Sequence, residues 1–417
     1  MGLSAVAPFR NRSFRLQWPA DLLTSCAFEM ETLILGWYVL TETGSVLLLT
    51  LFGALQFAGT LVSPMFGVTG DRIGHRNLLC GMRAVYTVLA ATLMAVALAG
   101  ALSPMLVFVI AGSIGLVRPS DLGVRLALIA DNVATHELTP AMGIARSTSD
   151  TARVGGALAG AGMFAAFGIG PAYIAVVSAY ALGLLLTTAI PRTQVKTRGL
   201  DATASGRPRP SPWRDLREGI AYVWSTPQLL AALLLAFLVN MTAYPLSNGL
   251  LPYVAKEIYR IDQAGLGYLV ASFALGALAG SVTVSMNGRG IRPARTMIVS
   301  AVAWYAMLFV FAQVQDPSGG MLMLMLAGFA QSICMVTLFI VMLRITTDNL
   351  RGRVMGVRML VIYSLPLGLL AAGALIERIG FGPTATLYAA VGLLSTVAIA
   401  VRWHAVLWHV QTPANAR

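Results

Sequence analysis

Charged side chains are scarce in this sequence of 417 residues, in which Asp, Glu, Lys and Arg together make up 11%. An ordinary soluble domain carries about 25%. Hydrophobic residues instead reach 57%, and a soluble fold has nowhere to bury so much apolar surface. The composition therefore excludes a soluble domain and predicts a membrane protein. Each membrane-spanning helix needs about 20 residues plus a short turn, so the chain has room for about twelve spans.

Cysteine and catalytic motifs are also rare. The three cysteines, Cys26, Cys80 and Cys334, lie inside apolar runs, which supports neither a disulfide framework nor a metal cluster. The sequence has no GxSxG motif, and Gly160-Ala161-Gly162 lies within a span, where small residues serve helix packing. We therefore expect a protein that is not an enzyme and that uses neither a metal nor another cofactor.

Apolar runs separated by turn residues predict twelve helices. We place them at residues 14–40, 46–69, 77–99, 104–130, 141–167, 171–190, 228–252, 265–286, 294–313, 320–345, 354–376 and 384–407. The first run follows arginines but is too long for a signal peptide and lacks a small-residue cleavage site, so we interpret it as a retained span. The seventh contains Pro245, followed by Asn248 and Gly249. We expect its outer end to be kinked or unwound and to serve as an outer gate.

The net charge of +12 follows this pattern of spans. If the N-terminus is cytoplasmic, most basic residues between spans fall on the cytoplasmic side, and the outer side receives only Lys256, Arg260 and Arg378. This asymmetry is the positive-inside rule, so we expect both termini in the cytoplasm. The excess of positive charge then requires no nucleic-acid partner.

A polar segment divides the spans into six and six. Residues 191–212 are rich in Arg, Pro, Ser and Gly and predict a flexible cytoplasmic linker. The apolar residues that follow recur at helical spacing opposite charged ones, which predicts a helix at the membrane surface. We therefore expect a six-helix bundle at 1–190, a linker with its interfacial helix at 191–227, and a second six-helix bundle at 228–417. Two short motifs recur at matching places in the halves, Asp131-Asn132 as Asp348-Asn349 and residues 168–171 as 380–383.

The segment after the second predicted span reads Gly67-Val68-Thr69-Gly70-Asp71-Arg72-Ile73-Gly74-His75-Arg76. It resembles the loop signature Gly-x-x-x-Asp-Arg-x-Gly-x-Arg of the major facilitator superfamily, although His75 replaces the usual basic residue. A positive-inside loop with glycine turns explains the arginines but not Asp71. The resemblance implies an all-α membrane fold of twelve helices in two pseudo-symmetric bundles. It also implies that Gly67, Asp71, Arg72, Gly74 and Arg76 belong to a cytoplasmic gate.

Three further stretches, residues 37–45, 138–145 and 351–356, are similar to the bacterial group of the superfamily that contains the enterobactin exporter and macrolide efflux proteins. This resemblance implies proton-driven export of a small, moderately apolar organic molecule across the bacterial cytoplasmic membrane, and we expect a monomer. Residues 155–160 depart from the pattern, since antiporters of the superfamily usually carry a Gly-Pro pair there. Uptake or lysophospholipid movement by the same fold is an alternative. A receptor or scaffold without transport is a further one.

Ionisable side chains at bilayer depth are costly, so each is a functional hypothesis. Glu29 and Glu31 lie in the first span, and Arg118, Asp121 and Arg125 share one face of the fourth. Asp121 can pair with either arginine, and the one net positive charge of this face can be neutralised by Glu29 or Glu31. These glutamates point about 200° apart on a helix, so both cannot face a cavity equally well.

We expect one of the two glutamates to bind the coupling proton. The resemblance places Arg118 where the superfamily has a fourth-helix arginine near its proton-titrating acid. Burial favours a neutral carboxyl and a nearby arginine favours a charged one, so an arginine that moves can load and release a proton. A static ion-pair network that locks helix packing is the alternative.

Other polar residues complete the candidate sites. Arg146, Asp150 and Arg153 share a face nearer the cytoplasmic end of the fifth span, where they form either ion pairs of an inner gate or substrate contacts. The second half has few intramembrane charges, and its candidate substrate contacts are Asn240, Tyr244, Gln331 and Tyr363.

Overall fold

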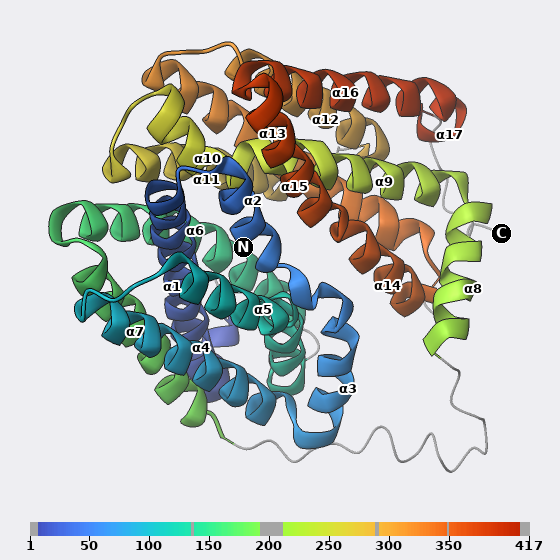
Figure 1. Cartoon of the computed structure of the whole chain (residues 1–417). Helices are drawn as coiled ribbons and strands as arrows, with labels where there is room; N and C mark the ends of the chain where they lie inside the picture. The colour runs from blue at the N-terminus through green and yellow to red at the C-terminus, as the bar shows by residue number, and fades with distance from the viewer. Residues whose placement is uncertain (1–6, 135–136, 192–211, 288–291, 348–349, 409–417) are drawn as a thin grey trace. The chain divides into compact units, whose positions relative to one another are not determined.

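The computed structural model describes residues 7–134, 137–191, 212–287, 292–347 and 350–408 of the chain. Every regular element in these residues is a helix (Figure 1). Nine helices within the described part are long and apolar enough to cross a membrane. The structure therefore confirms the all-α membrane class that the composition predicts.

Each predicted span has helical residues at its place. In the first half the elements are η1 (Ala7–Arg10), α1 (Arg12–Thr43), α2 (Val46–Leu55), η2 (Ala58–Leu61), α3 (Ser63–Ile73), α4 (His75–Leu98), α5 (Pro104–Asn132), α6 (Leu138–Phe167) and α7 (Ile169–Thr188). In the second half they are α8 (Pro212–Ser225), α9 (Pro227–Leu238), η4 (Val239–Ala243), η5 (Pro245–Gly249), α10 (Leu251–Tyr253), η6 (Val254–Ile258), α11 (Gln263–Asn287), α12 (Pro293–Phe311), α13 (Pro317–Ile345), α14 (Arg351–Ile362), α15 (Ser364–Ile379), α16 (Phe381–Arg402) and α17 (His404–Trp408).

The long helices begin and end at residues suited to those positions. Asn11 accepts a hydrogen bond from the backbone N–H of Ser13 at 2.8 Å and starts α1, and Gly44, with a φ of 64°, ends it. Asp316 starts α13 in the same way. Hydrogen bonds from the Ser318 hydroxyl and the Gly319 backbone N–H lower the pKa of the Asp316 carboxyl. These ends fix where the chain enters each helix.

The second predicted span is interrupted in the structure. A single helix over residues 46–69 was expected, but the chain forms α2, a 3₁₀ turn at η2 and then α3. The cause is a backbone contact with α5: a Cβ on Gly59 would lie 2.0 Å from the Leu116 carbonyl oxygen, and a Cβ on Gly115 would lie 1.9 Å from that of Leu55. The superfamily-like signature consequently lies on α3 and the start of α4, which corrects its placement in a loop.

The seventh predicted span, for which a kinked or unwound outer end was expected, is helical with irregular turns. Around Pro245 the turns widen into the π-helical elements η4 and η5, and η6 follows α10. Such turns accommodate a residue that has no backbone N–H to donate. Residues Pro227–Ile258 together form one of the nine apolar spans. The role of this segment as an outer gate remains a prediction.

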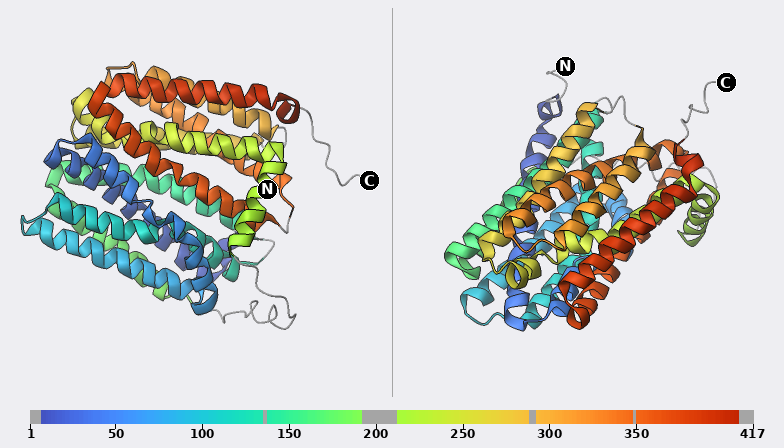
Figure 2. Two further views of the ribbon diagram at one scale, coloured as in Figure 1. Left: turned by 45° about the vertical axis from the view of Figure 1, so that its right-hand side comes forward. Right: turned by 90° about the horizontal axis from the view of Figure 1, so that it is seen from above.

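Residue contacts divide the chain into two compact units. Unit 1 comprises Met1–Arg209 and Leu250–Ala274, and unit 2 comprises Pro210–Gly249 and Leu275–Arg417. Within unit 1, α1 lies beside α6, and α4 lies beside α7 (Figures 1 and 2). The division at residues 190 and 228 inferred from the linker remains a prediction from the sequence.

The stretch predicted as an interfacial helix coincides with α8. Its residue Glu218 pairs with Arg353 of α14, with 2.8 Å between Oε2 and Nη1. Gly219 packs on the same segment, since a Cβ there would lie 3.0 Å from the Arg353 carbonyl oxygen. These contacts hold α8 against α14 within unit 2, while its position at the membrane surface remains a prediction.

Candidate functional site

Glu31 lies inside unit 1 and receives hydrogen bonds from two tyrosines of α7. The Tyr180 hydroxyl donates to Glu31 Oε2 at 2.8 Å, and the Tyr173 hydroxyl donates to Oε1 at 3.4 Å. The two tyrosines are seven residues apart and share one face of α7. All three side chains are buried. A carboxyl group at this depth needs such donors because an unpaired one would be costly.

Arg118 of α5 lines the same pocket as Glu31. Its Nη1 donates to Thr32 Oγ1 at 3.0 Å and also to Gln56 Oε1. Its guanidinium lies 4.7 Å from the centre of the Phe28 ring, a cation–π contact. Glu31, Thr32, Gln56 and Arg118 line one pocket together with Leu35, Phe52, Ala111 and Ile114. We call these eight residues with Tyr173 and Tyr180 the Glu31 centre.

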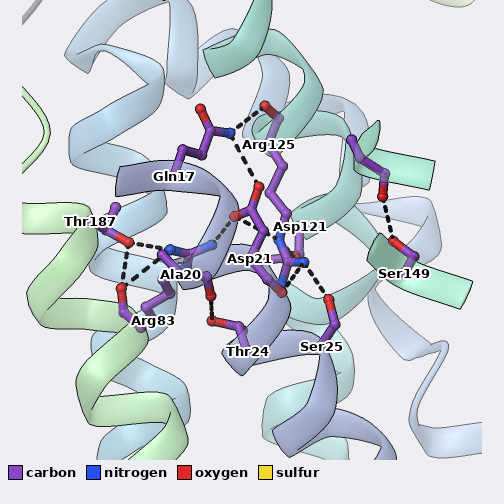
Figure 3. A network of polar contacts seen from close by, with 12 residues as sticks. Gln17, Ala20, Asp21, Thr24, Ser25, Arg83, Asp121, Arg125, Ser149 and Thr187 are labelled. Atoms are coloured by element: carbon purple, nitrogen blue, oxygen red, sulfur yellow. Dashed lines mark hydrogen bonds and ion pairs between the residues drawn. The ribbon is translucent and has the colours of Figure 1, made fainter. Parts of the chain in front are cut away.

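A second buried charge centre lies in the same unit (Figure 3). Asp21 of α1 pairs through Oδ1 with the guanidinium of Arg83 on α4, and the same oxygen lies 3.7 Å from Arg125 Nε. Arg125 of α5 also pairs with Asp121, one turn earlier on its own helix. We call these four residues, two acids and two bases, the Asp21 centre. Each is almost completely buried.

Neighbouring polar groups tie the Asp21 centre to four helices. Gln17 Nε2 donates to Asp21 Oδ2 at 3.3 Å and to the Arg125 carbonyl at 3.0 Å. Arg125 Nη1 donates to the Ser25 hydroxyl at 2.7 Å. Arg83 donates to the Thr187 hydroxyl of α7. The centre therefore joins α1, α4, α5 and α7 (Figure 3).

The stripe predicted on the fourth span is divided between the two centres. Asp121 pairs with Arg125, while Arg118 contacts the pocket beside Glu31. Asp21 and Arg83 were missed by the sequence analysis, although the rule that singled out Arg118 applies to them.

Glu29 points to a different neighbour. Its Oε1 lies 3.7 Å from Arg153 Nε of α6, and a quarter of its side chain is exposed. On the same helix Arg146 Nε lies 3.4 Å from the buried carboxylate of Asp150. The structure thus places the three residues of the fifth-span face in two separate ion pairs.

Small residues bring α6 against α1. A Cβ on Gly156 would lie 2.7 Å from the Cys26 carbonyl oxygen, and one on Gly160 would lie 2.8 Å from Met30 Cα. Residues 155–160 lack the Gly-Pro pair that antiporters of the superfamily usually carry there. The glycines at this place serve packing instead, because only glycine permits this backbone contact.

Most of the signature residues lie where α3 meets α4. Arg76 donates from Nε to the Ile190 carbonyl at 2.7 Å and from Nη2 to that of Thr188, so it caps the end of α7. Gly74 has a φ of 86° at the junction of the two helices. Gly67 and Arg72 are exposed on α3, and the side chain of Asp71 lies outside the described part.

The candidate contacts of the second half are partly brought together. Gln331 Nε2 donates to the Tyr244 hydroxyl at 2.7 Å, and Tyr244 packs edge-on against Trp304 with 5.2 Å between ring centres. Asn240 instead donates to the Ala236 carbonyl of its own helix at 2.8 Å. Tyr363 lies at the break between α14 and α15.

A family model described as Major Facilitator Superfamily matches residues 18–367. The chain belongs to the major facilitator superfamily. This confirms the resemblance inferred from the signature, together with the twelve-helix fold of two six-helix bundles that it implies. The protein is accordingly a multi-pass membrane transporter of this superfamily.

Comparison with curated proteins of the superfamily gives partial matches to exporters. The chain is 27% identical over 150 residues to an "Enterobactin exporter EntS" from Salmonella choleraesuis (strain SC-B67), which covers 36% of each protein. It is 25% identical over 168 residues to a "Multidrug efflux pump Tap" from Mycolicibacterium fortuitum, which covers 40% of this chain and 41% of that one. The matched stretches thus span well under half of these relatives.

Solved structures of the superfamily share the fold along nearly the whole chain. A POT family transporter, PepTSo, matches with a TM-score of 0.76 at 11% identity, covering 96% of this chain and 99% of that one. A D-xylose-proton symporter matches with a TM-score of 0.69 at 13% identity, covering 93% and 96%. At these identities the likeness concerns the fold alone.

Proposed function

We propose that this protein is a proton-coupled exporter of small, moderately apolar organic molecules in the cytoplasmic membrane of a bacterium, with Glu31 as the residue that binds the coupling proton. The observation that carries the proposal is the pocket that Glu31 and Arg118 line together. The partial matches to two exporters support the direction of transport.

The coupling follows from the charges in the pocket. With Glu31 ionised, its charge and that of Arg118 balance. When Glu31 takes up a proton, the Arg118 charge is left without that counter-charge, and the arrangement of Arg118 with Thr32 and Gln56 becomes less favourable than one in which it is solvated or paired elsewhere. A difference of about 1.4 kcal/mol between two conformations changes their ratio tenfold. Protonation of one buried acid is therefore enough to bias alternating access.

The pocket lining supports the substrate class. Leu35, Phe52, Ala111 and Ile114 form apolar walls, and a few polar groups lie among them. Ligand sites are commonly lined in this way, by apolar side chains with a few polar groups. The cavity is small, about 10 Å³, so a substrate with an apolar body and one or two hydrogen-bonding groups would enter it in a more open conformation of the transport cycle. Tyr244 and Gln331, which are hydrogen-bonded to each other in unit 2, are proposed as further substrate contacts.

Transport by purified protein in sealed vesicles tests the proposal. A ligand-stabilisation screen first identifies a transported compound, and its flux is then measured with and without a pH gradient. We expect the gradient to drive flux by the wild type and Glu31→Gln to lose this response. Glu29→Gln tests the competing acid, and Glu42→Gln, at the exposed end of the same helix, is the matched control. Flux that ignores the gradient in the wild type would refute proton coupling, and an unimpaired Glu31→Gln variant would remove Glu31 from the mechanism.

A further inference from the structure

Tyr86 of α4 carries a buried hydroxyl group without a partner. The side chain has no exposed surface, and no hydrogen bond to its hydroxyl oxygen is formed within the described residues. A phenylalanine would fill the same space without burying an unpaired polar group, so packing alone gives no reason for a tyrosine here. The hydroxyl therefore calls for a functional explanation.

Tyr86 lies between the two charge centres. Its ring packs against Tyr180, with 5.9 Å between ring centres, and against Phe28 at 4.9 Å. Tyr180 donates to Glu31. The Phe28 ring lies 4.7 Å from the guanidinium of Arg118 and 6.0 Å from that of Arg125. Phe28, Tyr86 and Tyr180 thus form an aromatic cluster. It contacts the Glu31 centre through Tyr180 and Arg118, and the Asp21 centre through Arg125.

Within the described residues, the Asp21 centre and the adjoining Gln17 also have buried polar atoms that lack hydrogen-bond partners. They are Gln17 Oε1, Arg83 Nε, Asp121 Oδ1 and Arg125 Nη2. Proteins hold internal water where several buried donors and acceptors lack protein partners. Asp121 Oδ1 is a carboxylate oxygen among them, and a carboxylate oxygen can accept a proton.

We propose that Tyr180 and Tyr86 carry the coupling proton between Glu31 and Asp121, so that the proton crosses the interior of unit 1 instead of returning through the pocket that Glu31 and Arg118 line. This inference rests on the proposed function, because it takes Glu31 as the proton-binding residue. It assigns a role to the Asp21 centre, which the proposed function leaves without one.

The transfer balances without forming a phenolate. The protonated Glu31 gives its proton to the Tyr180 oxygen while Tyr180 releases its own hydroxyl proton toward Tyr86, directly or through one bound water. Tyr86 accepts that proton and releases its own to Asp121 Oδ1. The net change is that Glu31 becomes a carboxylate and Asp121 a carboxylic acid. The arginines beside them, Arg118 on one side and Arg83 and Arg125 on the other, keep their charges.

Tyr86→Phe separates this role from a structural one, because it removes only the unpartnered hydroxyl. We expect its thermal stability to equal or exceed that of the wild type, its affinity for the transported compound to be unchanged, and its pH-driven flux to fall at least about tenfold, as expected for loss of a proton-transfer group. Asp121→Asn should show the same loss of pH-driven flux. Tyr38→Phe is the matched control, since it removes a hydroxyl that donates to the Leu102 carbonyl at 2.9 Å, away from both centres.

The outcomes distinguish this inference from the function on which it rests. A wild type without proton-driven flux would overturn both. A coupled wild type, an uncoupled Glu31→Gln variant and a Tyr86→Phe variant with wild-type flux would overturn the relay and leave the function standing. A Tyr86→Phe variant that loses stability and binding together with flux would also overturn the relay, because the hydroxyl would then be structural.

Discussion

Replacing Asp21 by Asn tests how much the Asp21 centre contributes to the stability of unit 1. The substitution keeps the size of the side chain but removes its charge. Arg83 and Arg125 then share the single remaining carboxylate, that of Asp121. Because both guanidinium groups are buried, the lost counter-charge cannot be replaced by bulk water. We therefore expect a strong destabilisation.

The magnitude follows from the contacts of the Asp21 carboxylate. It pairs with Arg83, accepts from Gln17 at 3.3 Å and lies 3.7 Å from Arg125. Removing one partner of a buried ion pair costs about 3–5 kcal/mol. Typical folded domains have a total stability of about 5–15 kcal/mol, so Asp21→Asn should lower the unfolding temperature clearly. Arg83→Met alone should cost a similar amount, because it leaves the buried Asp21 carboxylate without its Arg83 partner.

The assay is a double-mutant cycle by thermal unfolding in detergent. The cycle uses Asp21→Leu, Arg83→Met and the double variant that carries both. The double variant removes one acid and one base, and replacing a whole buried pair by apolar residues is often neutral. We expect it to be more stable than either single variant. Single effects that add within about 0.5 kcal/mol would refute the pairing. If the double variant is stable and still transports, the centre is a static lock, and if it is stable but inactive, the centre acts in transport.

Three further substitutions are predicted from the structure. Arg118→Lys keeps the charge but loses the planar fork that binds two side chains at once, so transport should fall while membrane insertion is retained; wild-type flux would remove Arg118 from the mechanism. Gly59→Ala should destabilise the protein by about 1–3 kcal/mol, because its Cβ would meet the Leu116 carbonyl; Gly67→Ala, with open space around it, is the control in the same unfolding assay. The lowered pKa of Asp316 stabilises the fold above the unfolded carboxyl's pKa of about 3.9, and this stabilisation is lost as the pH falls through the folded value. Asp316→Asn should flatten that part of the acid-unfolding profile, and superimposable profiles would contradict the assignment.

The fold class was accessible from the sequence because it depends on properties summed along the chain. Apolar runs report burial in a membrane wherever they lie, and the signature around Asp71 reports the family. The interruption at Gly59 was not accessible in this way. It arises where Gly59 meets the backbone of Leu116, some fifty residues later, and one glycine in an apolar run gives no sign of its partner.

The candidate site shows the same limit more sharply. Helical geometry correctly separates the directions of Glu29 and Glu31, but it cannot say which helix packs on which side. The structure decides this, with α6 brought to Glu29 by Gly156 and Gly160 and the tyrosines of α7 brought to Glu31. Asp21 was overlooked because its partner Arg83 lies on another helix. Pairings of this kind depend on packing between helices, which a single sequence does not encode in any local pattern.

The balance of two acids and two bases in the Asp21 centre has an electrical consequence. A group with no net charge can move within the membrane potential without doing work, whereas each elementary charge carried across the field involves about 2.3 kcal/mol per 100 mV. At the Glu31 centre the charge of Arg118 is balanced only while Glu31 is ionised. Under the proposed function, uptake of one proton therefore makes this centre the voltage-sensitive part of unit 1, and the membrane potential acts on the same step as the pH gradient.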